Sequence, residues 1–193
     1  KTRKNVSRLV INPISLNSYS KKYFSANRGL ANPQNPHQMI IITDSEREPF
    51  FQDFIAWKTA HGVDTAIFPK ENILAEPEYV GIDDQETIRN FIIDAYQTWA
   101  QTEIPLEYVI LGGDDEIIPA RGMWAAVDSV FAPGYEYHIV ETFLPSDLYY
   151  SALDGNWNAN GNEYYGEPDD EPDLLPEVAI GRISAETETE FQN

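Results

Sequence analysis

Three short apolar runs, separated by two amphipathic stretches, constrain the fold more than any other feature of this sequence. The runs are residues 39–43, 64–68 and 108–112. The first, MIIIT, is apolar without alternation, which is typical of a strand buried on both faces. Because strands alternate with helical patterns, the expected fold class is α/β, with a βαβαβ order, a mainly parallel sheet and helices on both faces.

The two intervening stretches carry helix start and stop signals. Ser45 with Glu48 predicts a capping box for the first helix, and Gly62 predicts its end. The second helix is expected to begin at an acidic cap formed by Asp83 and Glu86, and to run to about residue 101. Apolar residues recur at helical spacing at Phe50, Phe51, Phe54, Ile55 and Trp57 in the first stretch and at Ile88, Phe91, Ile92, Ala95 and Trp99 in the second.

Ligands of such sheets bind beyond the carboxyl ends of the strands. This rule places residues 43–45 and 112–115 on one rim of the predicted sheet. Asp114 and Asp115 could hold a cation or a basic side chain there. The simpler interpretation is that both aspartates serve the turn and cap the backbone.

The pattern loosens after residue 117. Residues 137–140 are predicted to form a strand at the sheet edge, and residues 146–150 are an aromatic, strand-like run. Residues 178–183 are a further apolar strand that contains Arg182. A buried guanidinium needs a carboxylate partner, so a structural ion pair is expected. Residues 186–191 look like the start of a helix, and the chain is expected to be a piece of a longer protein.

An acidic loop between these last strands resembles a calcium-binding loop. Asn156, Asn158, Asn160, Gly161 and Glu167 occupy positions 1, 3, 5, 6 and 12 of the pattern D-x-[DN]-x-[DN]-G-x5-E. Alternate side chains of a tight loop converge their oxygens, and a glutamate closes the shell. An asparagine-rich turn without an ion remains the alternative, although Glu163, Asp169 and Asp170 lie close enough in sequence to add charge. The predicted ligands are Asp154, Asn156, Asn158, Asn160, Asn162 and Glu167, with calcium as a structural ion.

Charge is distributed unevenly along the 193 residues. Residues 1–43 contain seven Lys or Arg and no acid, whereas residues 44–193 contain 32 acids and 6 bases, and +7 with −26 gives the net charge of −19. A body this acidic disfavours nucleic acid and anionic membranes and suits cations or basic peptides. No apolar run approaches the ~18 residues that span a bilayer, so no membrane span is expected.

The chain contains no cysteine, so it supplies no thiol nucleophile and no disulfide. The sequence also lacks the phosphate-binding, zinc-protease and serine-hydrolase motifs. Its three histidines, His37, His61 and His138, lie far apart. We therefore expect no catalytic residue and no organic cofactor site in this chain.

Several segments, taken in order, carry a resemblance to a known family: Met39–Ser45, Tyr108–Asp114 with Ile118–Ala120, Ser146–Tyr150, Leu153–Asn158 and Pro176–Ile183. They resemble the gingipain family of secreted cysteine endopeptidases, which have a three-layer caspase-like fold. The resemblance covers roughly residues 39–193. It implies a calcium-stabilised peptidase at the cell surface or in the medium, with a catalytic His and Cys on a second half that follows the last strand. That missing half would be the partner of this chain and would bind a peptide or protein substrate.

These observations predict a basic arm or linker at residues 1–37 and a partial domain at residues 38–193. The latter is interpreted as the N-terminal, non-catalytic subdomain of a gingipain-like peptidase. Two alternatives stay open. One is an inactive surface scaffold, adhesion or secretion-associated module with the same fold. The other is a response-regulator-like or nucleotide-binding domain, which the absence of a phosphate loop disfavours.

Overall fold

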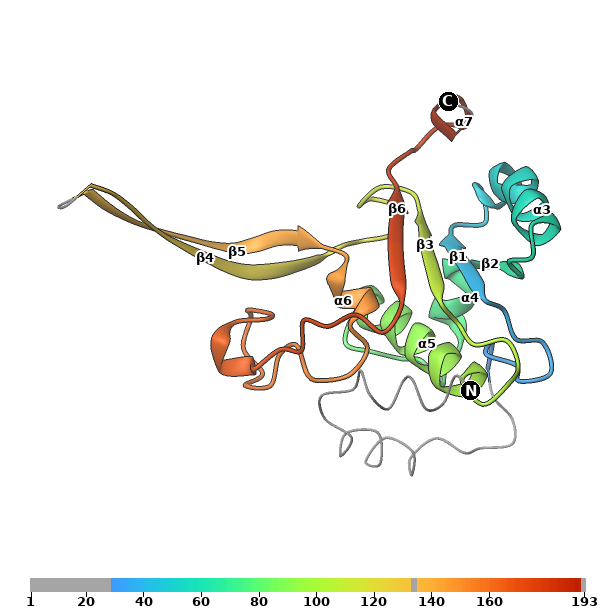
Figure 1. Ribbon diagram of the computed structural model, residues 1–193, viewed down its shortest axis with the longest axis horizontal. Coiled ribbons are helices and arrows are strands. Elements are labelled where there is room, and N and C mark those ends of the chain that lie inside the picture. The colour runs from blue at the N-terminus through green and yellow to red at the C-terminus, as the bar shows by residue number, and fades with distance from the viewer. Residues whose placement is uncertain (1–28, 133–134, 192–193) are drawn as a thin grey trace.

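A four-stranded parallel sheet forms the centre of the computed structural model, which describes residues 29–132 and 135–191 (Figure 1). Its order is β2-β1-β3-β6. The strands are β1 (Met39–Thr43), β2 (Thr65–Pro69), β3 (Tyr108–Gly112) and β6 (Ala179–Ile183). All five residues of β1 are buried, as expected for a central strand covered on both faces. The predicted parallel α/β sheet is confirmed.

One face of the sheet carries the main core. Ile40, Ile42, Val109 and Leu111 are fully buried there. They belong to one cluster with the apolar side chains of α4 (Lys70–Ala75) and α5 (Asp84–Trp99). The predicted apolar positions of α5, which are Ile88, Phe91, Ile92, Ala95 and Trp99, are all fully buried.

Asp83 caps α5 as predicted. Its Oδ1 accepts a hydrogen bond from the Glu86 amide at 2.9 Å, and the Glu86 carboxylate accepts one from the Ile82 amide at 2.6 Å. Each bond satisfies a backbone donor near the start of the helix.

The opposite face is covered by the 3₁₀ turn η1 (Glu48–Phe51) and α3 (Gln52–Ala60). Phe51 is buried against Gly112, where an added Cβ would lie 2.4 Å from the Phe51 ring. Contrary to the helical pattern, α3 has no buried residue, and Trp57 is 54% exposed. The helix ends at His61, before Gly62 with φ +86°, as predicted.

The predicted capping box of Ser45 and Glu48 is wrong. The Ser45 hydroxyl instead donates to Glu71 at 2.9 Å, and the Asp44 carboxylate accepts from the Arg47 amide at 2.9 Å. Asp44 therefore holds the turn that leads into η1, and no side chain caps η1 itself, because the Ser45 hydroxyl is bonded to a residue 26 positions away.

A long antiparallel hairpin, formed by β4 (Arg121–Ala132) and β5 (Tyr135–Ser146), makes a separate two-stranded sheet. It projects well away from the central sheet (Figure 1). Residues 137–140 are thus in a strand, as predicted, but its expected place at the edge of the main sheet is wrong, because among the described strands β5 pairs with β4 alone. Pro133-Gly134, a turn dipeptide, lies between the two strands in the sequence.

The aromatic run at residues 146–150 is helical rather than extended. It forms α6 (Leu148–Ser151), and Tyr149 and Tyr150 enter the core beside α5. A long loop follows, containing the 3₁₀ turn η2 (Pro168–Asp170), and leads into β6. The chain then forms the short helix α7 (Glu188–Phe191), as the sequence indicated.

The described part of the predicted arm, residues 29–37, packs against the body. Ala31 is fully buried, and the Trp99 Nε1 donates to the Asn32 carbonyl at 3.0 Å. Residues 1–28 lie outside the described residues, so the boundary at residue 37 stays a prediction. Among the described residues, no helix is long and apolar enough to cross a membrane.

Candidate functional site

The carboxyl ends of β1 and β3 meet at one rim, as predicted. The Thr43 hydroxyl donates to the Gly112 carbonyl at 2.5 Å. Beyond the strand end, Asp114 Oδ1 accepts from the Glu116 amide at 3.1 Å, and Asp115 Oδ1 accepts from the Ala120 amide at 2.6 Å. Both aspartates therefore make the turn and cap contacts that were the simpler interpretation of this segment.

The Arg182 side chain links the segments of this rim through hydrogen bonds. It extends from β6, and its Nε and Nη2 donate to the two carboxylate oxygens of Asp147 at 2.8 and 2.6 Å. Its Nη1 lies within 2.7–3.0 Å of the carbonyl oxygens of Gly113, Asp114 and Ile118. Burial alone would lower the pKa of Arg182, but the bonds and the charge of Asp147 raise it overall. The expected structural ion pair is confirmed.

A cavity of about 390 Å³ opens beside Arg182, between the turn after β3 and the root of the hairpin. Three carboxylates line it, and its one guanidinium is already paired with Asp147. A hydrogen bond with Glu186 lowers the pKa of Asp114, and the same contact raises the pKa of Glu186. The cavity is therefore acidic. Its lining consists of Asp114, Asp115, Ala120, Pro145, Ser146, Asp147, Arg182 and Ser184.

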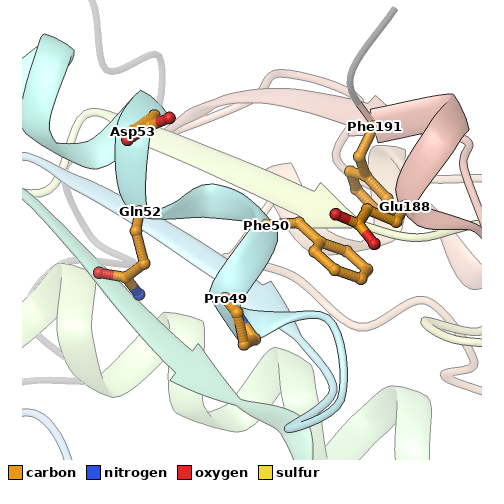
Figure 2. A pocket seen from close by; sticks show the side chains of 6 residues that line it. All are labelled: Pro49, Phe50, Gln52, Asp53, Glu188 and Phe191. Atoms are coloured by element: carbon orange, nitrogen blue, oxygen red, sulfur yellow. The ribbon is translucent and has the colours of Figure 1, made fainter.

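A second, smaller cavity of about 190 Å³ lies between η1 and α7 (Figure 2). Phe50 points towards Phe191 there, and their ring centroids are 5.5 Å apart. Phe191 also meets Phe51 edge-to-face at 5.1 Å. These aromatic contacts fix α7 against η1, and the cavity lining brings no cationic group near its two acids, Asp53 and Glu188.

The acidic loop is built from successive turns in which asparagine side chains hold the backbone. The Oδ1 atoms of Asn156, Asn160 and Asn162 each accept from the amide two residues later, at 2.7–3.0 Å. Asn162 Nδ2 donates to Glu167 at 2.6 Å, and Asn158 Nδ2 donates to the Asn162 carbonyl at 2.8 Å. Five of the six predicted ligands are therefore close together in one loop.

Two oxygens in this loop are buried without a hydrogen-bond partner, namely Asn158 Oδ1 and Asp170 Oδ2. Asp170 is only 4% exposed, and its other oxygen accepts from the Asn160 amide at 3.3 Å. A buried carboxylate without a cation or enough donors is costly. The sequence suggested Asp170 only as extra charge, because the residue lies beyond the twelve-residue pattern.

Asp154, the sixth predicted ligand, lies in a different cluster. Burial and the neighbouring Asp173 raise its pKa, and its Oδ1 is also buried without a partner. Glu177, whose pKa is raised by burial, accepts from the Leu153 amide at 2.5 Å nearby. Across the described residues, no group of three or more His, Cys, Asp or Glu side chains has a geometry that could hold a metal. Any ion in the loop would therefore rely on amide and carbonyl oxygens as well.

Arg121 connects the loop to the hairpin and to α5. Its guanidinium donates to both Asp83 oxygens at 2.8 and 2.7 Å and lies over the rings of Tyr149 and Tyr165, 4.6 and 4.2 Å from their centroids. Burial alone would lower its pKa, but Asp83 raises it overall. The Trp124 amide donates to the Tyr165 carbonyl at 2.8 Å. We call the contacts of Arg121 with Asp83, Tyr149 and Tyr165 the Arg121 clamp. No sequence signal indicated it, because these three partners are distant from Arg121 in the chain.

The model of peptidase family C25 matches residues 32–193. The chain belongs to peptidase family C25. This confirms the resemblance to gingipains, which the strand that contains Arg182 and the acidic loop indicated together. No curated protein sequence matches the chain significantly.

Solved structures similar to this C25 chain are much longer than it is. A structure described as a protease matches with a TM-score of 0.54 and 20% identity, covering 82% of this chain and 26% of that one. The complex of Porphyromonas gingivalis RgpB pro- and mature domains matches with a TM-score of 0.49 and 26% identity, over 80% and 26% of the two chains. The Arg-specific cysteine proteinase gingipain R (RgpB) gives 0.47 and 25%, over 86% and 28%. The chain thus spans about a quarter of these structures.

Proposed function

We propose that this chain is the N-terminal subdomain of the catalytic domain of an exported, gingipain-type cysteine endopeptidase. The observation that carries the proposal is the C25 match over residues 32–193. The parallel sheet supports it, because the gingipain resemblance implies an α/β fold of this class.

In this proposal the nucleophile comes from polypeptide outside this sequence, because the chain has no cysteine. A thiolate there would attack the scissile carbonyl, with a histidine as acid and base. The role of the present chain is structural. β6 is an edge strand of the sheet, and the remaining strands of the peptidase would extend the sheet from it. Arg182 would hold the rim next to that junction.

The test is hydrolysis of fluorescently labelled casein by this chain and by the full-length polypeptide that contains it. We expect no hydrolysis by the chain alone, and hydrolysis by the full-length protein that iodoacetamide abolishes. We also expect the full-length protein in the medium or on the cell surface. An inert full-length protein with an intact cysteine and histidine would favour the inactive surface-scaffold interpretation instead.

We further propose that the acidic loop binds calcium as a structural ion. Support comes from the unpartnered, buried oxygens of Asn158 and Asp170 and from the neighbouring oxygens of Asn160, Asn162 and Glu167. Calcium prefers such carboxylate, amide and carbonyl oxygens. When bound, the ion would neutralise the buried charge of Asp170 and join the two ends of the loop.

Calcium is expected to raise the melting temperature of the chain. At an ion concentration about 100 times Kd, the gain is about 2.7 kcal/mol, or roughly 5–11 °C for a domain of this size. Asp170→Asn should abolish this gain and, in chelator, should melt no lower than wild type, because the buried charge is removed. Scanning calorimetry with calcium and with chelator measures both effects.

The matched control is Asp169→Asn, which makes the same change in charge at the exposed neighbouring residue. It should keep the full calcium response. Equal melting temperatures of the wild type in calcium and in chelator would show that the loop is a turn without an ion. This outcome would leave the peptidase proposal untouched.

A further inference from the structure

The hairpin exposes backbone and side-chain surface that the body does not cover. Near the start of β4, the Trp124 amide on the outer edge of the hairpin donates a hydrogen bond to the Tyr165 carbonyl. In the part of the chain that the structure describes, no backbone hydrogen bond from outside the hairpin reaches β5 between residues 139 and 146. An unpaired strand edge is a template for another extended chain. The edge of β5 is therefore open over residues 139–146.

Four of the large exposed apolar side chains lie close together on β5. They are Ile139, Val140, Phe143 and Leu144, which are 59%, 42%, 69% and 50% exposed. Single exposed apolar residues are common, but a cluster of this kind marks an interaction surface.

Both faces of the hairpin contribute to this cluster. Leu144 is the register partner of Met123, and Val140 is that of Ala126. A register shift between these pairs, at Met123 to Ala125, places Phe143 next to Gly122. A strand added to the edge of β5 could therefore pack apolar side chains on either face.

Charge determines which chain would bind. The acidic cavity lies at the root of β5, where Pro145 and Ser146 form part of its wall with Asp114 and Asp115. Glu141 is exposed on the same strand. Two copies of a chain with a net charge of −19 repel each other, whereas a basic segment is attracted.

We propose that the outer edge of β5 is a docking surface for an extended, basic polypeptide segment of a partner protein. The segment adds as a strand, inserts apolar side chains beside Phe143 and Leu144, and directs a Lys or Arg side chain towards the acidic cavity. This proposal goes beyond the peptidase function and does not depend on it.

The test uses the 193-residue chain and a fluorescein-labelled peptide of about ten residues that alternates lysine and valine. Fluorescence anisotropy should show saturable binding that weakens at high salt. The double variant Ile139→Ser/Phe143→Ser should weaken binding about tenfold or more. Hydrogen exchange of the β5 amides should slow when the peptide binds.

The matched control is Leu174→Ser/Leu175→Ser, which removes two apolar side chains of similar exposure, 59% and 53%, from the loop before β6. It should bind the peptide as wild type does, and a glutamate–valine peptide should not bind. Equal binding by the hairpin variant, binding of the glutamate–valine peptide, or no saturable binding would overturn the proposal. Sedimentation that shows a dimer only when Ile139 and Phe143 are intact would identify a second copy as the occupant and would also overturn it.

Discussion

Replacing Arg182 with methionine is expected to lower the free energy of unfolding by about 3–5 kcal/mol. The side chain of Arg182 is only 14% exposed, and that of Asp147 is 24% exposed. Methionine keeps most of the volume but leaves the Asp147 carboxylate and three carbonyl oxygens without their common donor. The loss is therefore dominated by polar groups that stay buried and unpaired, rather than by lost packing.

Urea unfolding of a double-mutant cycle separates these contributions. Asp147→Leu alone should also destabilise the chain, because it leaves the guanidinium partly buried without its counter-ion. The double variant Arg182→Met/Asp147→Leu should recover part of the loss, since both charges are then absent. A loss below about 1 kcal/mol for Arg182→Met would show that the rim does not depend on this residue.

Replacing Trp99 with alanine should cost about 3–5 kcal/mol. Trp99 is fully buried at the end of α5, where its ring lies edge-on to His37, with centroids 5.6 Å apart. Its Nε1 also donates a hydrogen bond to the Asn32 carbonyl. Alanine would leave a large cavity beneath the sheet and would detach the segment that leads into β1.

Trp99→Phe is the matched control, because it keeps an aromatic ring and removes the hydrogen bond. It should cost markedly less than Trp99→Ala, and thermal and urea unfolding should rank the two variants in the same order. Equal losses for both variants would mean that the bond to Asn32, and not the packing, stabilises this end of the helix.

The central sheet was predictable because its signals are local. Continuous apolar runs such as Ile40–Ile42, with helical spacing between them, report burial without any knowledge of distant contacts. Asp83 was predicted as a helix cap for the same reason, since its partner Glu86 is three residues away. Arg182 could be assigned an ion pair from its apolar surroundings, although its partner could not be identified.

The predictions that were wrong or missed all concern residues whose partners are distant in the sequence. Ser45 has a capping sequence, but Glu71 takes its hydroxyl. Tyr149 and Tyr150 belong to an aromatic run that resembles a strand, yet they lie in α6, directly after Asp147, the partner of the distant Arg182. In the acidic loop, the template found the turn asparagines but not Asp170, because burial of a carboxylate depends on the three-dimensional packing of the loop.

The β4–β5 hairpin leaves the body at Arg121 and returns at Ser146, its register partner. Its two ends are thus neighbours, and the clamp of Arg121 with Asp83 and Tyr165 fastens the point where they meet. Met123 and Trp124 still contact the body, but past them the hairpin is a modular excursion whose length and sequence can change with little effect on the rest of the chain. Evolution, or a protein engineer, could exchange this hairpin for another while retaining the central sheet.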